Sequence, residues 1–298
     1  MRIFVTGATG FIGSALIPEL RNAGHHVLGL TRSEEGAKSL IAAGAQAHRG
    51  DLEDLESLRS GAAASDAVIH TAFIHDFSKF QENCEIDRRA IEALGSALVG
   101  SDRLLIVTSG TGLVHQGQGL LATENDPPVS SQVIPRGASE EAATSFAARC
   151  VRVAIVRLPQ VHDTKKQGLV SYAIRLAREK GVSAYVGDGH NRWPAAHLLD
   201  AAHLYRLALE KAGADAIYHA VAEEGVPLRD IAEVVGRGLN VPVVSIAPEE
   251  AAGHFGWLAA FVGRDALASS AQTRKQLGWN PTGPGLITDL ENMQYFPA

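Results

Sequence analysis

Short apolar runs alternate with amphipathic stretches along the first two-thirds of the chain. Most of these runs are apolar on both faces, which is typical of central strands covered by helices on both sides. Between them, apolar residues at three- and four-residue spacing predict helices, as in residues 52–62 and 88–99. We therefore predict an α/β fold, a doubly wound parallel sheet. Its predicted strands are residues 3–6, 26–30, 67–70, 104–108, 151–157 and 217–221.

The pattern becomes less regular after Pro159. The triplet at residues 187–189 predicts a turn, and residues 228–239 predict a helix that is followed by Pro242 and a short strand. No internal repeat or flexible linker stands out. We expect a first domain over residues 1–160 and a smaller lobe, mainly residues 161–298, packed against it. A strand–helix unit near residues 197–222 is expected to return to the first domain.

Three glycines follow the first predicted strand in the sequence GATGFIG at residues 7–13. Gly7 allows a tight turn, Gly10 lets a pyrophosphate approach the backbone, and Gly13 lets the next helix pack closely on the strand. Free N–H groups and the positive end of the helix dipole favour phosphates here. The loop therefore predicts a Rossmann-type dinucleotide site. Its expected contacts are Gly7, Thr9, Gly10, Phe11, Ile12 and Gly13.

Pro18 lies inside the helix that this loop is expected to open. A proline in a helix interior removes a backbone hydrogen bond and crowds the preceding turn. We expect it to bend the helix or to cost on the order of 3 kcal/mol.

The second predicted strand leads into Thr31, Arg32 and Ser33. NAD sites usually carry an acidic residue here that binds the ribose hydroxyls, but the first acid is Glu34. The hydroxyl and guanidinium groups can instead donate to a 2′-phosphate, and Arg32 can cover the adenine. We therefore predict NADP(H) as the preferred cofactor, with NAD(H) as the alternative. The other interpretation of Arg32 is a solvated loop arginine.

Asp51 and Leu52 follow the third strand pattern. Both are candidates for contact with the adenine edge of the cofactor. An equally good interpretation makes Asp51 the N-cap of the next helix.

Charge and cysteine content narrow the class of partner. The net charge is −6, and no block of like charges stands out, which argues against nucleic acid or a membrane surface as the main partner. Cys84 and Cys150 form no disulfide framework, and no cysteine–histidine spacing predicts a metal site. No apolar run approaches ~20 residues, and the chain enters a strand pattern at once, so we expect neither a membrane span nor a signal peptide. These features favour a small-molecule substrate and a cytoplasmic location.

Taken together, the motifs resemble the extended branch of the short-chain dehydrogenase/reductase superfamily, the epimerase/dehydratase-like proteins. The fingerprint TGxxGxxG stands at residues 6–13, and the resemblance continues through GDL at 50–52, VIHTA at 68–72, VTSGT at 107–111 and RLP at 157–159. It extends to GDG at 187–189, His197, Asp200 and LGWNP at 277–281. It implies a Rossmann domain with a small substrate-binding lobe, often in a homodimer. It also implies cofactor contacts at Thr71, Ala72 and Pro159.

The resemblance breaks at the catalytic motif. Family members use a Ser or Thr together with Tyr-x-x-x-Lys, in which the Lys lowers the pKa of the Tyr and binds the nicotinamide ribose. Here Arg136 stands where the Tyr is expected and Glu140 where the Lys is expected, and no tyrosine of the chain is followed by Lys four residues later. The chain thus resembles atypical members that keep the cofactor site. Thr111 best matches the catalytic Ser or Thr that family members have at the end of a strand, and Ser109 is the alternative.

Arg136 has two interpretations. It cannot be a general acid at neutral pH, because its pKa stays above ~12. Together with Thr111 it can polarise a carbonyl oxygen while water delivers the proton. Alternatively, Arg136 and Glu140 form an i, i+4 ion pair on a helix surface.

Histidines offer a second catalytic route, because imidazole titrates near neutrality. His115 and His162 both follow predicted strands, at the end of the sheet where ligands bind. A structural role is the alternative for each of them.

Three other residues near the expected site carry weaker signals. Trp193 lies in an expected loop before His197, where it either stacks on an apolar or aromatic ligand or packs within the lobe. Glu124 and Asp126 are expected to lie on a solvated loop ahead of two prolines.

Two classes of function remain. The first is an NADPH-dependent oxidoreductase that reduces a carbonyl, imine or activated alkene of a small organic molecule. The second is a non-catalytic NADP(H)-binding redox sensor, which the loss of Tyr and Lys favours. A nucleotide-sugar epimerase or dehydratase fits by analogy of fold only, and it normally uses the missing pair.

Overall fold

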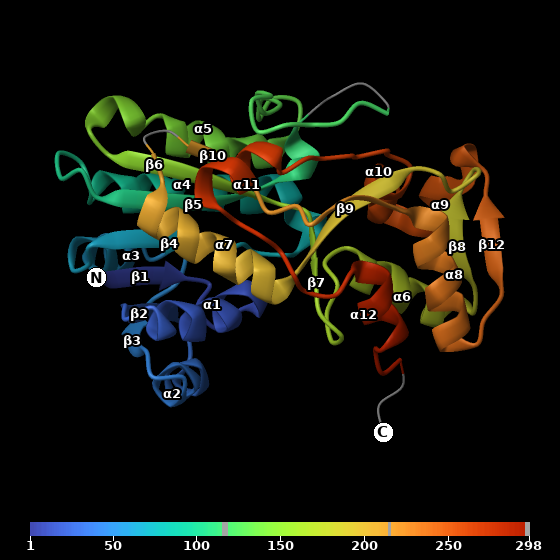
Figure 1. Cartoon of the computed structure of the whole chain (residues 1–298), viewed down its shortest axis with the longest axis horizontal. Helices are drawn as coiled ribbons and strands as arrows, with labels where there is room; N and C mark the ends of the chain where they lie inside the picture. The colour runs from blue at the N-terminus through green and yellow to red at the C-terminus, as the bar shows by residue number, and fades with distance from the viewer. Residues whose placement is uncertain (115–118, 214–215, 296–298) are drawn as a thin grey trace.

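Seven parallel strands form the main sheet of the computed structural model, which describes residues 1–114, 119–213 and 216–295 (Figure 1). The chain runs outward from β1 to β2 and β3, then crosses to β4 and continues in the other direction. This arrangement confirms the predicted Rossmann-type fold, whose ligands bind where the strand order reverses. In spatial order the strands are β10 (Ala216–His219), β6 (Arg152–Leu158), β5 (Leu104–Gly110), β4 (Ala67–His70), β1 (Arg2–Thr6), β2 (His26–Thr31) and β3 (Gln46–Arg49).

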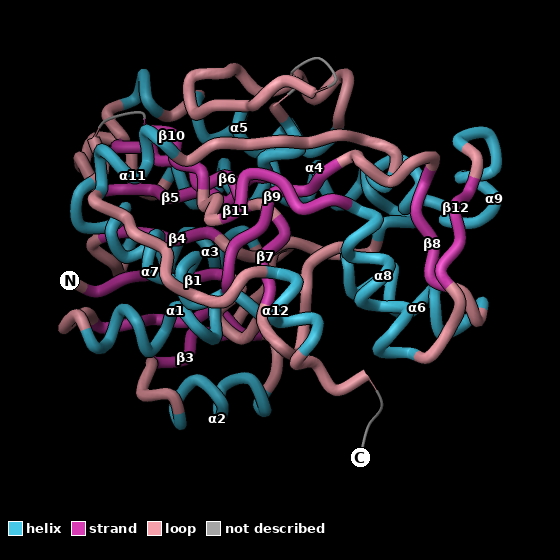
Figure 2. Tube along the Cα trace, turned by 45° about the vertical axis from the view of Figure 1, so that its right-hand side comes forward, coloured by secondary structure: helices cyan, strands magenta, loops and turns pink. Residues whose placement is uncertain are grey.

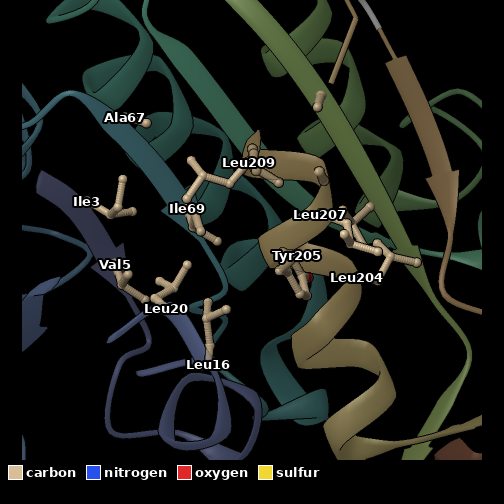
Figure 3. Close-up of a cluster of buried hydrophobic side chains, with 14 of the residues drawn as sticks. Ile3, Val5, Leu16, Leu20, Ala67, Ile69, Leu204, Tyr205, Leu207 and Leu209 are labelled. Atoms are coloured by element: carbon tan, nitrogen blue, oxygen red, sulfur yellow. The ribbon is translucent and has the colours of Figure 1, made fainter. Parts of the chain in front are cut away.

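Helices cover both faces of this sheet, as strands that are apolar on both faces predict. One core joins the sheet to α1, α2 and α7, and Figure 3 shows side chains of β1 and β4 beside those of α1 and α7. A second core joins the opposite face to α3, α4 and α5. No helix in the described part of the chain is both long and apolar enough to cross a membrane. The helices are α1 (Phe11–Asn22), α2 (Glu34–Ala42), α7 (Leu198–Lys211), α3 (Leu55–Ala63), α4 (Phe80–Ser96) and α5 (Ala138–Thr144).

A smaller lobe packs beside the sheet domain, on the right in Figure 1. It has its own apolar core, which includes Trp193, Ile231 and Leu286. The two parallel strands β8 (Ser183–Val186) and β12 (Val243–Ile246) form its outer sheet. Its helices are α6 (Val170–Lys180), α8 (Leu228–Leu239), α9 (Ala251–Phe255), α10 (Ala259–Val262) and α12 (Leu286–Glu291).

A third sheet lies between the domain and the lobe, in the order β11 (Glu223–Pro227), β9 (Arg192–His197) and β7 (Gln160–His162) (Figure 2). The expected loop around Trp193 is therefore wrong, because residues 192–197 form β9. Pro194 signalled a loop, yet it lies opposite a register shift between Glu223 and Val226. Proline is tolerated in strands at such irregularities, since no ladder hydrogen bond is lost there.

Several boundaries differ from the sequence-based expectation. The helix expected over residues 52–62 begins at Leu55, and the one expected over 88–99 begins at Phe80. The chain keeps a helix through Pro18, whose ring lies at the exposed side of α1. Short 3₁₀ helices make up several connections: η1 (Phe77–Lys79), η2 (Thr111–Leu113), η3 (Pro135–Gly137), η4 (Ala147–Arg149), η5 (Pro248–Glu250) and η6 (Gly256–Leu258).

The last part of the chain returns to the sheet domain. α11 (Ala271–Leu277) leads to Trp279, which is buried in the core beneath α7 and donates its indole N–H to the carbonyl of Asp200 at 3.0 Å. The Asp200 carboxylate accepts the backbone N–H groups of Thr282 and Gly283 at 3.0 and 2.8 Å. Asp200 therefore fastens the C-terminal segment to α7.

Candidate functional site

The glycine-rich loop makes the close contacts that its spacing predicts. Gly7 has a φ of +66°, and a Cβ there would lie 2.7 Å from the backbone nitrogen of Ala72. A Cβ on Gly13 would lie 2.1 Å from the carbonyl oxygen of Gly7. Side chains at these two positions would collide with backbone, so the loop needs glycine at both.

Gly10 differs from these two glycines because its missing side chain opens toward solvent. Gly10 is exposed, and a Cβ there would meet only Gly7, whose oxygen lies at 3.0 Å. Gly10 also caps α1, where no side chain accepts a hydrogen bond and the first turn holds no acid. Backbone N–H groups and the positive end of the helix dipole are therefore left for an anion. The loop fits a pyrophosphate, in a space that a side chain at Gly10 would fill.

The residues after β2 occupy three different environments. Thr31 is buried, and its hydroxyl lies 3.4 Å from the carbonyl of Ser33. Ser33 caps α2 by accepting the N–H of Gly36 at 3.0 Å. Arg32 is exposed and thus presents a cation at this end of the site.

Asp51 shapes the turn before α3. Its carboxylate accepts the N–H groups of Glu53 and Asp54 at 2.8 and 3.0 Å, and Asp54 is the residue that caps α3. The interpretation of Asp51 as the helix cap is therefore wrong, because the helix begins three residues later than expected. Leu52 is half-buried and packs against the core beneath α3 and α4.

A chain of hydrogen bonds connects the glycine-rich loop to α4. The Thr6 hydroxyl lies 2.8 Å from Nδ1 of His70, and Nε2 of His70 lies 2.9 Å from the carboxylate of Asp87. Thr6 also accepts the N–H of Ala72 at 3.3 Å, and its carbonyl accepts the hydroxyl of Thr71 at 2.8 Å. Because an ionised carboxylate only accepts, Nε2 of His70 donates to Asp87, and Nδ1 shares a hydrogen bond with the Thr6 hydroxyl.

Arg136, which the sequence resemblance matches to the family tyrosine, is held on several sides. Its Nη1 donates to the Asp87 carboxylate at 2.5 Å and to the Ser139 hydroxyl, and its Nη2 donates to the carbonyl of Thr108 at 3.2 Å. The guanidinium carbon lies 4.1 Å from the ring centroid of Phe73. Burial alone would raise the pKa of Asp87, but the charge of Arg136 and hydrogen bonds to the carboxylate outweigh it and lower that pKa.

Glu140, which the sequence resemblance matches to the family lysine, does not pair with Arg136. It is buried, and its carboxylate accepts two N–H groups of Arg157 at 2.9 and 2.8 Å and the hydroxyl of Ser109 at 2.5 Å. The predicted surface pair between Arg136 and Glu140 is therefore wrong. Both charges are turned inward, and each pairs with a countercharge from another element because a buried charge without a partner is costly.

The two candidate hydroxyls lie near the end of β5. Ser109 donates to Glu140, whereas Thr111 opens η2 with its hydroxyl 3.4 Å from the carbonyl of Leu158, next to the half-buried Pro159. A hydrogen bond of that length is weak. A substrate that binds the Thr111 hydroxyl therefore replaces a weaker hydrogen bond than one that binds the Ser109 hydroxyl. His115 lies outside the described residues.

His162 and Trp193 belong to the interior of the protein. His162 is fully buried with Nδ1 2.7 Å from Asp289, and desolvation lowers its pKa despite that carboxylate. Trp193 is buried and donates its indole N–H to the carbonyl of Phe261 at 3.3 Å. The lobe-packing interpretation of Trp193 is confirmed, and the ligand-stacking one is wrong.

Glu124 is also buried, contrary to expectation. Its Oε1 accepts both the N–H and the hydroxyl of Thr273 at 2.8 and 2.7 Å, which caps the first turn of α11 from outside that helix. Asp126, half-buried, accepts the N–H and hydroxyl of Thr123 at 2.7 and 2.8 Å. Sequence patterns do not reveal such caps when donor and acceptor lie far apart in the chain.

Other residues at the site were not expected from the sequence. Asp87 is one of several polar residues of α4, and nothing in the pattern marks it as buried. The Lys166 ammonium lies 5.5 Å from the ring centroid of Phe11 at the glycine-rich loop. Desolvation, followed by the positive charges of Lys166 and Arg136, lowers the pKa of His75. The aromatic-rich run at residues 73–80, directly after β4, is the signal that could have identified this segment.

Comparison with known proteins agrees with the fold and the glycine-rich loop. Residues 3–222 match the model of the NAD dependent epimerase/dehydratase family. An uncharacterized protein of Schizosaccharomyces pombe is 50% identical over 297 residues, which cover 99% of this chain and 100% of that protein. A 2-alkyl-3-oxoalkanoate reductase of Stenotrophomonas maltophilia is 29% identical, with 83% of this chain and 78% of that protein covered.

A solved structure extends the likeness to the whole architecture. UDP-glucose 4-epimerase of Thermus thermophilus, in complex with NAD, superposes with a TM-score of 0.76 at 20% identity, covering 99% of both chains. The matched sequence model spans well over half of the chain and includes the glycine-rich loop, β4 and the strand-end hydroxyls. The chain belongs to the NAD dependent epimerase/dehydratase family, the extended short-chain dehydrogenases/reductases.

Proposed function

We propose that this protein is an NADPH-dependent oxidoreductase that reduces a carbonyl group, or a related imine or activated alkene, of a small organic molecule. The observation that carries the proposal is the open loop at Gly10, an uncapped helix start at the switch point of the sheet. Family membership supports a nicotinamide dinucleotide as the ligand of this loop.

The environment of Arg32 supports NADPH over NADH. Arg32 is exposed directly after β2, and the nearest acid, Glu34, has its carboxylate 3.5 Å from the guanidinium of Arg49. An exposed guanidinium favours a 2′-phosphate, whereas ribose hydroxyls usually need an acidic residue. Glu34 is oriented toward Arg49, so this loop does not present that acid to a ribose.

Bound NADPH would supply a hydride to the carbonyl carbon, while the C=O π-electron pair moves to oxygen. Thr111 is the hydroxyl that would donate to this oxygen, and the charge of Arg136 would stabilise it. Because Arg136 keeps its protons at neutral pH, the proton that completes the alcohol comes from water. Asp87 and Thr108 hold the guanidinium in place, so this cation does not have to be ordered during the reaction.

The test measures NADPH oxidation against a panel of ketones, aldehydes, quinones and imines. Thr111→Val should lower turnover by ~10²-fold, the cost of losing one oxyanion donor, without changing the affinity for NADPH. Arg136→Lys should retain part of the activity, because a point charge replaces the guanidinium fork. Thr282→Val changes an exposed threonine far from β5 in sequence and is the matched control. Full turnover in both site variants would place the reaction elsewhere.

A non-catalytic redox sensor is the second candidate, and one observation favours it. Both residues at the positions of the family Tyr and Lys are engaged in buried ion pairs, Arg136 with Asp87 and Glu140 with Arg157. Neither residue is arranged to move a proton. Tight NADPH binding without reduction of any panel member would support the sensor and contradict the enzyme.

A further inference from the structure

The segment after β4 meets the small lobe through a cluster of aromatic rings. Phe77 of η1 stacks on Trp257 of η6 with ring centroids 4.2 Å apart and planes inclined by 8°. The edge of Tyr172, from α6, contacts both rings, at 5.7 and 5.0 Å between centroids. The contact thus joins the sheet domain to two elements of the lobe.

The aromatic cluster is continuous with the candidate site. Phe80 lies 5.8 Å from Phe77 and 6.4 Å from Phe73, centroid to centroid. Phe73 in turn lies against the guanidinium of Arg136, and the two residues before it contact the glycine-rich loop. A path of rings therefore leads from the oxyanion donors to the Phe77–Trp257 pair.

The two stacked rings are supported differently. Phe77 has a rigid support, because Asp76 caps η1 by accepting the N–H and hydroxyl of Ser78 at 3.0 and 2.6 Å. The side chain of Asn83 fixes the carbonyl of Asp76 at 2.8 Å.

Trp257 follows Gly256, which has a φ of +56°, and a Cβ on Gly256 would meet no atom within 4 Å. Trp257 is also 38% exposed, whereas Trp193 and Trp279 are buried. It is thus a large aromatic ring at the surface, next to a glycine beside open space.

We propose that Phe77 and Trp257 form a stacking site for a planar aromatic ring of the substrate, which makes aryl-fused ketones and quinones the preferred substrate class. That the bound ring belongs to a substrate rests on the proposed function. That a planar aromatic ring binds at this site does not. A ring enters when the two centroids separate to about 7 Å, twice the contact distance of stacked carbon atoms. A hinge at Gly256 provides this movement, and the entering ring replaces the stacking that the two side chains lose.

The experiment compares two ketones of matched size, 2-tetralone, which contains an aromatic ring, and the saturated 2-decalone. The parent protein should have a KM for 2-tetralone about tenfold lower than for 2-decalone. Trp257→Ala and Phe77→Leu should remove this difference by raising the KM for 2-tetralone while kcat changes little. Trp257→Phe keeps an aromatic ring and should retain most of the difference in KM between the two ketones. Ile41→Ala, which changes another exposed apolar residue, should behave as the parent.

Binding without turnover separates this inference from the proposed function. Calorimetry in the presence of NADPH compares 2-naphthol with decahydro-2-naphthol, neither of which accepts a hydride. Selective binding of 2-naphthol that Trp257→Ala abolishes and Trp257→Phe preserves supports the stacking site even if no ketone is reduced. Equal binding of both alcohols, or equal KM values for both ketones in an active enzyme, overturns it. If Trp257→Ala does not fold, Phe77→Leu and Trp257→Phe give the same comparison.

Discussion

The carboxylate of Asp87 and the guanidinium of Arg136 lie 2.5 Å apart, and Arg136 is the residue that the sequence resemblance matches to the family tyrosine. The carboxylate is fully buried and also accepts from His70 and Ser139. The pair therefore connects α4, the end of β4 and η3. Its energetics give the first two predictions.

Asp87→Asn should lower the free energy of unfolding by about 3 kcal/mol, because it leaves the charge of Arg136 without its partner. Asn keeps an oxygen that accepts the hydrogen bond from His70, so the loss of unfolding free energy measures the effect of removing the negative charge. Adding Arg136→Met to Asp87→Asn should recover at least half of the unfolding free energy that Asp87→Asn loses. Glu56→Gln, which breaks the exposed pair with Arg59, is the control and should change stability little. Urea unfolding measures all four proteins, and a double variant less stable than Asp87→Asn alone would contradict this account.

The same pair predicts how stability changes in acid. The folded pKa of Asp87 is lower than the unfolded value of about 3.9, so its stabilising contribution is complete above that value and is lost as pH falls toward the folded pKa. The difference in unfolding free energy between the parent and Asp87→Asn should stay constant from about pH 8 to pH 5 and shrink below about pH 4. A stability difference between the two proteins that grows in acid would mean that folding raises the pKa of Asp87 instead of lowering it.

The fold could be predicted from sequence because its central strands are apolar on both faces and GATGFIG directly follows the first of them. Residues 67–70 match β4 at both ends. The strands of the middle sheet could not be predicted. β7 has only three residues, and β9 contains Pro194, which is acceptable only because of the irregular pairing with β11.

Gly10→Val should abolish NADPH binding and lower the unfolding temperature far less than Gly13→Val does, because a Cβ at Gly10 would meet only the Gly7 backbone, whose oxygen lies at 3.0 Å. Gly13→Val is the matched variant, and it should destabilise the fold strongly, since its Cβ would meet the Gly7 carbonyl at 2.1 Å. Calorimetric titration with NADPH and thermal unfolding give the two readouts. Unchanged affinity in Gly10→Val would mean that the loop is only a turn.

Arg32→Ala should weaken NADPH binding by on the order of 1–3 kcal/mol, the range of a lost charge-assisted hydrogen bond, and barely affect NADH. The parent should bind NADPH at least several-fold tighter than NADH. Arg59→Ala, which removes another exposed arginine from α3, should leave both affinities unchanged. Equal affinities of the parent for the two cofactors would contradict the preference.

The candidate site was predictable to a different extent at its two ends. The phosphate-binding loop could be identified because its function requires glycine at fixed spacing. The substrate end depends on partners that are distant in sequence: Arg136 contacts Asp87 and Phe73, and Glu140 contacts Arg157. The i, i+4 spacing of Arg136 and Glu140 suggested a local pair, whereas tertiary burial gave each charge a partner from another element.

The attachment of the C-terminal segment to α7 has a consequence for how the protein is made. Trp279 completes the core between α1 and α7, and Asp200 holds it there. On a ribosome, this face of the sheet stays incomplete until Trp279 has been synthesised, after most of the lobe. We therefore expect the sheet domain to reach the native state only after the lobe has been synthesised, rather than before it.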